Sequence, residues 1–237
     1  MAFYYAMDVT ADDGNIKTIN TRFDRIKMDM SVLGIKMDVD TRKIGDTSAT
    51  NPTAQMTRVF RCVTGRSLTM QVDAEGNVLS VKGAEEMAKA IADSLVLDGE
   101  DRKEMMERVD NNFGERMMKG QYARFFYIFP NKQVKVGDTW ERSTEVGGQL
   151  GGEYHSTYKV TAIEGDMVTL DEVSTIKPAG KDADGTSMKG DVKGVLIVDS
   201  RSGLLVNADQ DIDMKIAKNG MEIVLKAKTK VKGKARG

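Results

Sequence analysis

The stretch Ile212-Asp213-Met214-Lys215-Ile216-Ala217-Lys218-Asn219-Gly220-Met221-Glu222-Ile223-Val224-Leu225-Lys226 contains two alternating apolar runs around one Asn-Gly pair. Asn-Gly is the strongest two-residue signal for a β-hairpin, because both central residues of a type I′ turn need a positive φ. If Asn219-Gly220 forms the loop, Lys218 pairs with Met221 and every pairing further out follows. The stretch therefore predicts an antiparallel hairpin, with a positive φ at Gly220.

The register that this loop imposes is consistent on both faces of the hairpin. One face carries apolar pairs and the other carries three pairs of opposite charge, and such agreement between turn chemistry and pattern is strong support for a register. Each exposed charge pair contributes less than ~1 kcal/mol, so the charges specify register and solubility more than stability. The expected pairs are Ile216 with Ile223, Met214 with Leu225, Ile212 with Ala227, Asp213 with Lys226, Asp211 with Lys228, and Asp209 with Lys230.

Turns of related chemistry recur upstream of the hairpin. In residues 71–78 and 197–204 an apolar strand runs into an Asp that is followed shortly by a Gly and a second apolar run, which is typical of a tight reversal between antiparallel strands. Residues 16–43 also alternate, with a reversal expected at Leu33-Gly34. That reversal places Met30 opposite Met37 and Met28 opposite Val39, and it also places Asp29 opposite Asp38, a like-charge pair that costs some stability.

Helical spacing is confined to the first half of the chain. Apolar residues recur every three or four positions in three segments, which begin near Pro52, after Gly83 and near Asp98 or Gly99. Gly65 and Gly120 are expected to end the first and third helices. The stripes are Met56, Val59, Phe60 and Val63, then Ala84, Met87, Ala88, Ile91 and Leu95, then Met105, Met106, Val109, Phe113 and Met117.

These patterns predict an α+β protein. A large, curved antiparallel sheet, similar to half a barrel, is expected to carry about three helices on its apolar face. We expect one domain over residues 1–237 with a shared core, a helical insertion at about 51–121 and a C-terminal β-meander at about 134–234. A chain of 237 residues is long enough to bury a sizeable core.

The composition excludes several classes of protein. A net charge of −1 gives no general attraction to nucleic acid, so no nucleic-acid partner is expected. The single cysteine, Cys62, excludes an internal disulfide and a thiolate metal cluster. No apolar run approaches the ~20 residues that span a bilayer, so no transmembrane segment is expected. Sixteen methionines favour an adaptable core, because Met side chains are flexible.

No recognisable catalytic or cofactor motif occurs. The chain has neither a phosphate-binding glycine loop nor a nucleophile elbow, so no cofactor and no catalytic residue are expected and the protein is interpreted as non-enzymatic. An unrecognised hydrolase is the least favoured alternative. Tyr154, Tyr158 and Val160 share one face of a predicted strand, so the single histidine, His155, falls on the other, polar face. It is more typical of a surface residue than of a general base. Asp209, Asp211 and Asp213 lie in a strand opposite lysines, and Asp182-Ala183-Asp184-Gly185 has Gly180 where a calcium loop needs a carboxylate, so no metal site is expected.

Apolar surface is the remaining candidate for a functional site. Flexible Met and large aromatic side chains suit a surface that accepts varied apolar shapes, and they suit an ordinary core equally well. Aromatic residues also gather in residues 122–129, just before the strands of the second half. The candidate ligand-binding residues are Met87, Ile91, Met105, Met106, Val109, Phe113, Phe125, Phe126 and Trp140.

Three short phrases support a resemblance to a known family. They are Val72–Val78 with Val81-Lys82-Gly83, then Phe129-Pro130 followed by Val134–Trp140, and finally Val198-Asp199 with Ser202-Gly203. In order and spacing, over roughly residues 20–215, the chain resembles a family of exported proteins of unknown function that is common in gut Bacteroidetes. The resemblance implies an envelope location and an upstream signal or lipoprotein segment, and it supplies no activity or catalytic residue. The expected sheet with inserted helices is also similar to periplasmic lipoprotein carriers, by fold alone.

Two functions follow as expectations. The first is a non-enzymatic envelope protein that binds a lipid or other apolar or amphiphilic ligand between helices and sheet. The second is an interaction or structural module that binds another envelope protein through a sheet edge or face. Residues 1–9 read directly as a strand and not as a signal peptide. The resemblance implies a periplasmic or outer-membrane-anchored location after removal of a segment upstream of this chain, with the cytoplasm as the alternative.

Overall fold

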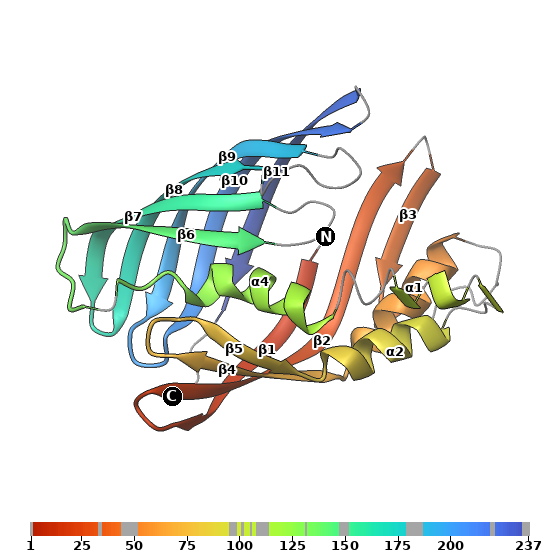
Figure 1. Cartoon of the computed structure of the whole chain (residues 1–237), viewed down its shortest axis with the longest axis horizontal. Helices are drawn as coiled ribbons and strands as arrows, with labels where there is room; N and C mark the ends of the chain where they lie inside the picture. Colours follow the sequence, from red (N-terminus) through yellow and green to blue (C-terminus); the bar gives the residue numbers. More distant parts are fainter. Residues whose placement is uncertain are drawn as a thin grey trace. The chain divides into compact units, whose positions relative to one another are not determined.

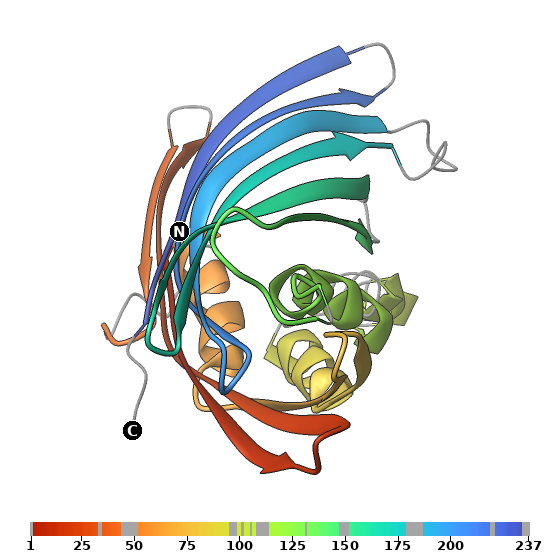
Figure 2. The same ribbon diagram turned by 90° about the vertical axis from the view of Figure 1, so that its left-hand side faces the viewer.

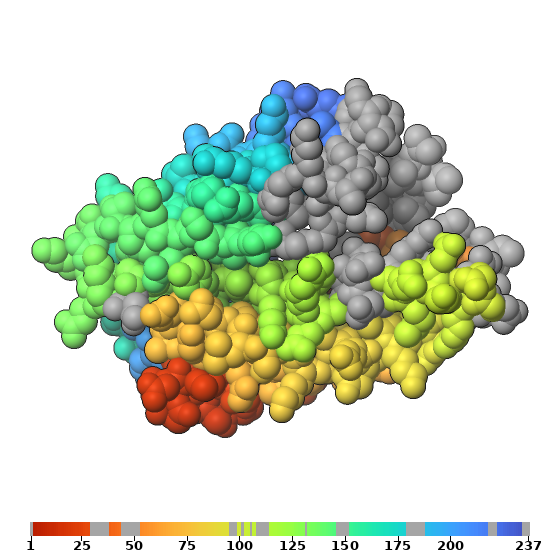
Figure 3. All heavy atoms as spheres, in the orientation of Figure 1, coloured from red at the N-terminus to blue at the C-terminus, as the bar shows by residue number. Residues whose placement is uncertain are grey.

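A computed structural model describes residues 2–32, 35–43, 52–94, 99–100, 102–104, 106–107, 114–130, 132–146, 152–178, 187–218 and 221–233 (Figure 1 and Figure 3). Most of these residues are in antiparallel strands and the rest of the regular structure is short helices, which confirms the coarse fold prediction. The chain divides into two compact units. Unit 1 is Met1–Gln71 with Leu79–Met118, and unit 2 is Val72–Val78 with Lys119–Gly237. The predicted single shared core is not tested by this division and stays a prediction.

Unit 1 is built on strands β1 (Ala2–Asp12), β2 (Ile16–Val32), β3 (Ile35–Asp40), β4 (Ser67–Asp73) and β5 (Val78–Lys82). They form one sheet in the order β1-β2-β4-β5, with β3 also paired to β2. A turn at residues 12–15 joins β1 to β2, and the Asp13 carboxylate accepts hydrogen bonds from the backbone N–H groups of Asn15 and Ile16. These bonds lower the pKa of Asp13, that from Ile16 most. On β2, Ile19, Ile26 and Met28 are buried.

The register predicted between β2 and β3 is confirmed. Met30 pairs with Met37, Met28 with Val39, and Asp29 with Asp38, so the like-charge pair is present. The reversal itself, at residues 33–34, lies outside the described residues. At the end of β3, the Arg25 guanidinium donates two hydrogen bonds to the buried Asp40 carboxylate, with an Nε–Oδ1 distance of 2.9 Å.

The first two predicted helices are present in unit 1. Helix α1 (Pro52–Val63) begins at the proline, whose fixed φ and missing N–H suit a first turn. Helix α2 (Ala84–Ser94) follows Gly83 and buries the predicted stripe from Ala84 to Ile91. Both helices are amphipathic, so their burial against the unit 1 core accounts for their stability better than intrinsic propensity does.

The third predicted helix differs from the structure. Residues 99–100, 102–104 and 106–107 are helical, but a separate helix, α4 (Glu115–Phe126), runs through Gly120 to the aromatic group. Gly120 therefore does not end a helix, and that expectation was wrong. A mid-helix glycine costs only about 1 kcal/mol relative to alanine. The buried residues Met117, Met118, Tyr122 and Phe126, at helical spacing on both sides of it, offset that cost.

Unit 2 contains a six-stranded antiparallel meander. Its strands are β6 (Thr139–Val146), β7 (Gly152–Glu164), β8 (Met167–Lys177), β9 (Ser187–Asp199), β10 (Leu204–Lys218) and β11 (Met221–Lys232), and they are neighbours in that order. Figure 2 shows that the sheet is bent across its strands. In the described residues β6 and β11 are its two edges, and the sheet does not close on itself.

The C-terminal hairpin has the predicted register in every pair. Ile216 faces Ile223, Met214 faces Leu225 and Ile212 faces Ala227. The three predicted charge pairs are present as ion pairs, between Lys226 and Asp213 at 3.4 Å, Lys228 and Asp211 at 3.2 Å, and Lys230 and Asp209 at 2.9 Å. The positive φ predicted for Gly220 lies outside the described residues.

Candidate functional site

The inner face of the β6–β11 sheet is the candidate site. We define it as the face that carries Tyr154, Tyr158 and Val160 on β7, as predicted, together with the residues that pair with them on neighbouring strands. Every second residue along β8 and β9 belongs to this face, and each of these residues is buried or is a glycine. One buried cluster on it contains Tyr158, Val160, Leu170, Leu196 and Val198, and a second contains Tyr154, Ile176, Met188 and Val192.

Residues 124–129, at the end of α4 and just beyond it, lie against this face near β6 and β7. The Trp140 Nε1–H donates to the carbonyl oxygen of Ile128 at 2.7 Å, and the indole ring lies 6.0 Å from the Tyr158 ring. The Arg124 guanidinium lies 4.0 Å from the centre of the Tyr154 ring, which is a cation–π distance. These contacts hold Trp140 half-buried, so its indole reports on the environment of this face.

Arg142 adds a second cationic contact in the same region. Its Nε–H donates to the carbonyl oxygen of Phe129 at 2.9 Å, and its guanidinium lies 4.7 Å from the Tyr127 ring. Burial has the largest effect on the pKa of Tyr158 and raises it, and the positive charges of Arg124 and Arg142 partly oppose that rise. The helix end and β6 therefore bring two cations and several aromatic rings to one side of the sheet.

A polar row crosses the apolar inner face. The Glu172 carboxylate is buried and accepts hydrogen bonds from the Ser174 hydroxyl at 2.8 Å and from the Gln210 amide at 2.5 Å. The hydroxyl oxygens of Ser174 and Ser156 lie 2.7 Å apart. Burial, and next the negative charge of Glu172, raise the pKa of Tyr158 to about 12. The carboxylate is thus held by neutral donors of its own sheet, as a buried charge requires.

Gly194 provides the room for this row. It sits on β9 between Glu172 on β8 and Gln210 on β10. A Cβ at this position would lie 2.6 Å from the Cγ of Gln210 and 2.6 Å from a backbone oxygen of β10. The glycine therefore lets the Gln210 side chain cross β9 and reach Glu172, and it permits the close approach of β9 and β10.

The exposure of the inner face increases toward the β11 edge. In one row across the sheet Tyr154 and Ile176 are buried, Met214 is half-buried and Leu225 is 39% exposed. In the next row Met188 is buried, Ile216 is half-buried and Ile223 is 60% exposed. We call the exposed and half-buried part of these rows, Met214, Ile216, Ile223 and Leu225, the apolar strip. It continues a buried core outward without a polar boundary.

The residues predicted for the ligand site are divided between the two units. In unit 1, Met87 and Ile91 are buried on α2, and Met106 is 37% exposed. In unit 2, Phe126 is buried, Phe125 is 37% exposed and Trp140 is half-buried. The predicted residues Met105, Val109 and Phe113 lie outside the described residues. The prediction that these nine residues form one ligand site remains a prediction.

Sequence reasoning missed the polar row. A signal for it is present in β8, where Glu172 and Ser174 occupy the alternate positions between Leu170 and Ile176. Two polar residues on an otherwise apolar strand face indicate a buried polar group. The apolar strip was recognised only as hairpin pairs, because sequence alternation specifies which residues share a face and not how far that face is covered.

The candidate catalytic residue, His155, lies apart from this row, and residues 182–185 lie outside the described residues. His155 falls on the opposite face, where its Nδ1 is 2.9 Å from the Ser143 hydroxyl and its Nε2 is 3.3 Å from the Glu153 carboxylate. It does not combine with Ser174 and Glu172 into a Ser-His-acid arrangement. Within the described part of the chain no three metal-ligating side chains cluster.

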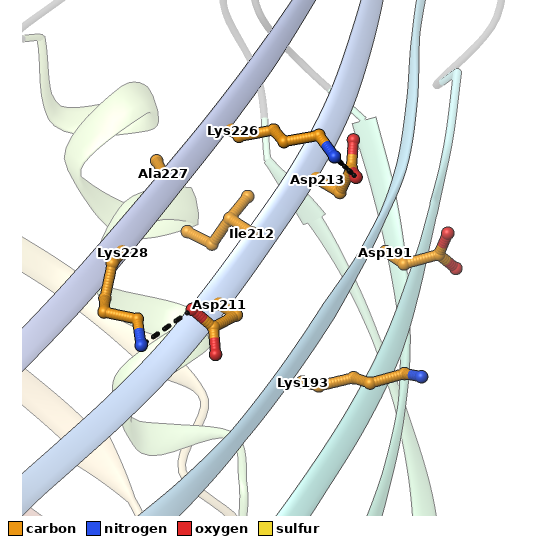
Figure 4. A pocket seen from close by; sticks show the side chains of 8 residues that line it. All are labelled: Asp191, Lys193, Asp211, Ile212, Asp213, Lys226, Ala227 and Lys228. Atoms are coloured by element: carbon orange, nitrogen blue, oxygen red, sulfur yellow. Dashed lines mark ion pairs between the residues drawn. The ribbon is translucent and has the colours of Figure 1, made fainter.

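The described part of the surface includes a larger and a smaller hollow. The larger, of about 670 Å3, is lined by residues of β9, β10 and β11 (Figure 4). Its charges balance, because three aspartates and three lysines line it and Lys226 and Lys228 pair with Asp213 and Asp211. The other, of about 550 Å3, lies between α1 and α2 and is lined largely by arginines.

Comparison with known families gives one match, which covers residues 14–205 and is described as a family of unknown function, DUF6263. The chain belongs to this family. DUF6263 membership confirms the predicted placement in an uncharacterised family, and the matched range includes the three phrases from which the resemblance was drawn. No curated protein and no solved structure matches the chain. Across the described residues of this DUF6263 chain, no helix has the length and apolar character needed to cross a bilayer.

Proposed function

We propose that this protein is a non-enzymatic binder of apolar or amphiphilic molecules, and that the inner face of the β6–β11 sheet contacts the ligand. The observation that carries the proposal is the apolar strip. Ile223 and Leu225 are exposed to water although they pair with Ile216 and Met214, which lead directly into a buried core cluster. Covering the strip with an acyl chain would remove its apolar surface from water, at about 25 cal/mol per Å2.

The bent sheet supports a finer version of the proposal. In this version the sheet acts as half a barrel around the ligand, and the end of α4 covers one side of it. Arg124 and Arg142 stand near that helix end, stacked on tyrosine rings. An acyl chain along the strip with its acidic head group toward these cations would match the amphiphilic character of the face.

A pair of variants tests the apolar strip. Ile223 and Val224 are adjacent on β11, are 60% and 53% exposed, and point to opposite faces of the sheet. Ile223→Lys should weaken binding of a fluorescent fatty acid about tenfold, whereas Val224→Lys should leave it within about twofold. Quenching or transfer of Trp140 emission measures binding, since Trp140 is the single tryptophan. Absence of saturable binding by the wild-type protein at micromolar concentration would contradict the proposal.

The second candidate function, an interaction module, has its own observation. β11 is an edge strand, and its residues 223–225 expose apolar side chains on both faces, whereas Lys226, Lys228, Lys230 and Lys232 follow them. Lysines protect an edge from pairing, and residues 221–225 contain none. If a partner strand adds to this edge, Ile223→Lys and Val224→Lys should both reduce partner capture from the native host.

An envelope location is part of the proposal, by analogy with the exported family that the chain resembles. Fractionation of the native host tests it, because an envelope protein should be recovered outside the cytosol. Native mass spectrometry of that material, followed by lipid extraction, would identify a bound ligand. Recovery in the cytosol would end the envelope assignment and would leave the binding experiment unaffected.

A further inference from the structure

The hollow between α1 and α2 has an unusual lining. It measures about 550 Å3 and belongs wholly to unit 1. Arg58 and Arg61 are three residues apart on α1 and so share one side of that helix, while Arg66 follows the helix end. Its described lining consists of Arg58, Arg61, Cys62, Arg66, Ala90, Asp93 and Ser94.

The described lining of this hollow is rich in arginine. Among its described lining residues three arginines stand against one carboxylate, that of Asp93, and Asp93 also forms an ion pair with Arg102. The Arg61 guanidinium donates to the carbonyl oxygen of Lys43, which is a neutral acceptor and leaves the positive charge in place. The larger hollow differs, because three aspartates there balance three lysines.

The geometry also leaves space for a ligand. The α2 side of the hollow is lined by the small residues Ala90 and Ser94, and the Ser94 hydroxyl is turned back to the carbonyl oxygen of Ile91. The hollow is an open depression of the surface, so a small charged group can reach the guanidinium groups directly from solvent. Arginine is the side chain best suited to phosphate, because its planar fork donates two parallel hydrogen bonds to two oxygens.

We propose that the hollow lined by Arg58, Arg61 and Arg66 binds a phosphate group, carried either by a soluble small molecule or by a lipid headgroup. The described lining includes three guanidinium groups and one carboxylate, that of Asp93, which is itself paired with Arg102, so an anionic ligand is favoured. A phosphate group offers more acceptor oxygens to several guanidinium groups than a carboxylate does. The site lies in the other unit from the apolar strip and does not depend on the function proposed for it.

Calorimetric titration of the full chain with inorganic phosphate, at constant ionic strength in chloride, tests the site. Arg66 is exposed at the rim, so Arg66→Gln should fold normally and raise the Kd about tenfold. Arg61→Lys keeps the charge and removes the fork, and should weaken binding by less. The matched control is Arg22→Gln, an exposed arginine on β2 paired with Asp24, which should leave the Kd within about twofold.

The single cysteine localises the ligand. Cys62 lines the hollow, so bound phosphate should slow its alkylation by neutral N-ethylmaleimide in the wild-type protein and not in Arg66→Gln. Vesicles distinguish the two sources. Binding to phosphatidylglycerol and not phosphatidylcholine vesicles, lost in Arg66→Gln, indicates a lipid headgroup, whereas phosphate protection without vesicle binding indicates a soluble phosphate compound. The proposal would be overturned if the wild-type protein showed no saturable phosphate binding, or if Arg22→Gln and Arg66→Gln lost affinity for phosphate equally.

Discussion

At the residue scale, Gly76 leaves the least room for a Cβ among the glycines that the structure describes. It has a φ of 92°, and a Cβ there would meet the backbone oxygen of Phe126 at 2.0 Å. It closes the turn in which the Asp73 carboxylate accepts hydrogen bonds from the N–H groups of Glu75 and Asn77. The Asp-to-Gly phrase that predicted a tight turn therefore also positions the end of α4.

We expect Gly76→Ala to destabilise the protein by more than ~2 kcal/mol, since it combines backbone strain with a steric clash. Gly14→Ala is the matched control. Gly14 has a φ of 88° in the turn between β1 and β2, but nothing lies within 4 Å of its Cβ position, so it should cost only the ~1 kcal/mol of strain. Urea unfolding of both variants measures the difference. Equal losses would show that the clash with Phe126 is relieved without cost.

The Arg25–Asp40 pair predicts a specific dependence of stability on pH. The Arg25 hydrogen bonds hold the pKa of the Asp40 carboxyl well below its ordinary value of 3.8. A carboxyl whose pKa is lower in the folded than in the unfolded state stabilises the fold above the ordinary pKa, and this contribution is lost as pH falls below it. The thermal midpoint should therefore fall on acidification below about pH 4.

Asp40→Asn should lower the midpoint at neutral pH and should flatten its fall in acid. The measurement is a set of melting curves from neutral pH to about pH 3. Asp24→Asn, which removes an exposed partner of Arg22, serves as the control and should follow the wild-type curve. A variant curve parallel to that of the wild type would show that Asp40 is not responsible for the acid sensitivity.

At the element scale, two substitutions on β8 test how much the polar row contributes to stability. Glu172→Ala should destabilise by about 2–3 kcal/mol, because it removes a buried side chain and leaves the Gln210 amide donor without its acceptor. Asp171→Ala, on the exposed face of the same strand, should change stability by less than ~0.5 kcal/mol. Guanidinium unfolding compares the two. A small loss in Glu172→Ala would indicate that water replaces the carboxylate.

Registers were the most predictable part of the fold. The β10–β11 pairing follows from one Asn-Gly dipeptide, and the β2–β3 pairing from one reversal, because a turn of known length specifies every pairing beyond it. The end of the third helix was not predictable in this way. Gly120 is a weak local signal, and the buried residues that carry α4 past it act through tertiary packing.

The candidate site was predictable only in part. Alternation correctly assigned Tyr154 and Tyr158 to the buried face and His155 to the other. The polar row depends on Gly194 and Gln210, which are distant in sequence from Glu172 and meet it through two strand pairings. The arginine-lined hollow depends likewise on the packing of α1 against α2, which places Arg58 and Arg61 opposite Ala90 and Ser94.

At the scale of the whole molecule, the chain crosses between its two units inside elements of regular structure. β4 (Ser67–Asp73) begins in unit 1 and ends in unit 2, and α4 (Glu115–Phe126) does the same. A strand or helix that belongs to two units couples their unfolding, because neither unit can lose its part of the element without disrupting the other part. The single shared core predicted from the sequence stays a prediction, which the cooperativity of unfolding tests.

We therefore expect one cooperative thermal transition for the whole chain, with equal calorimetric and van't Hoff enthalpies. Asp40→Asn changes unit 1 and Gly76→Ala changes unit 2. Both variants should shift the same transition to lower temperature, because destabilising either of two coupled units lowers the unfolding free energy of the whole chain. Differential scanning calorimetry measures this shift directly. Two separate transitions, with each variant lowering only one of them, would show that the units unfold independently and that the shared core does not exist.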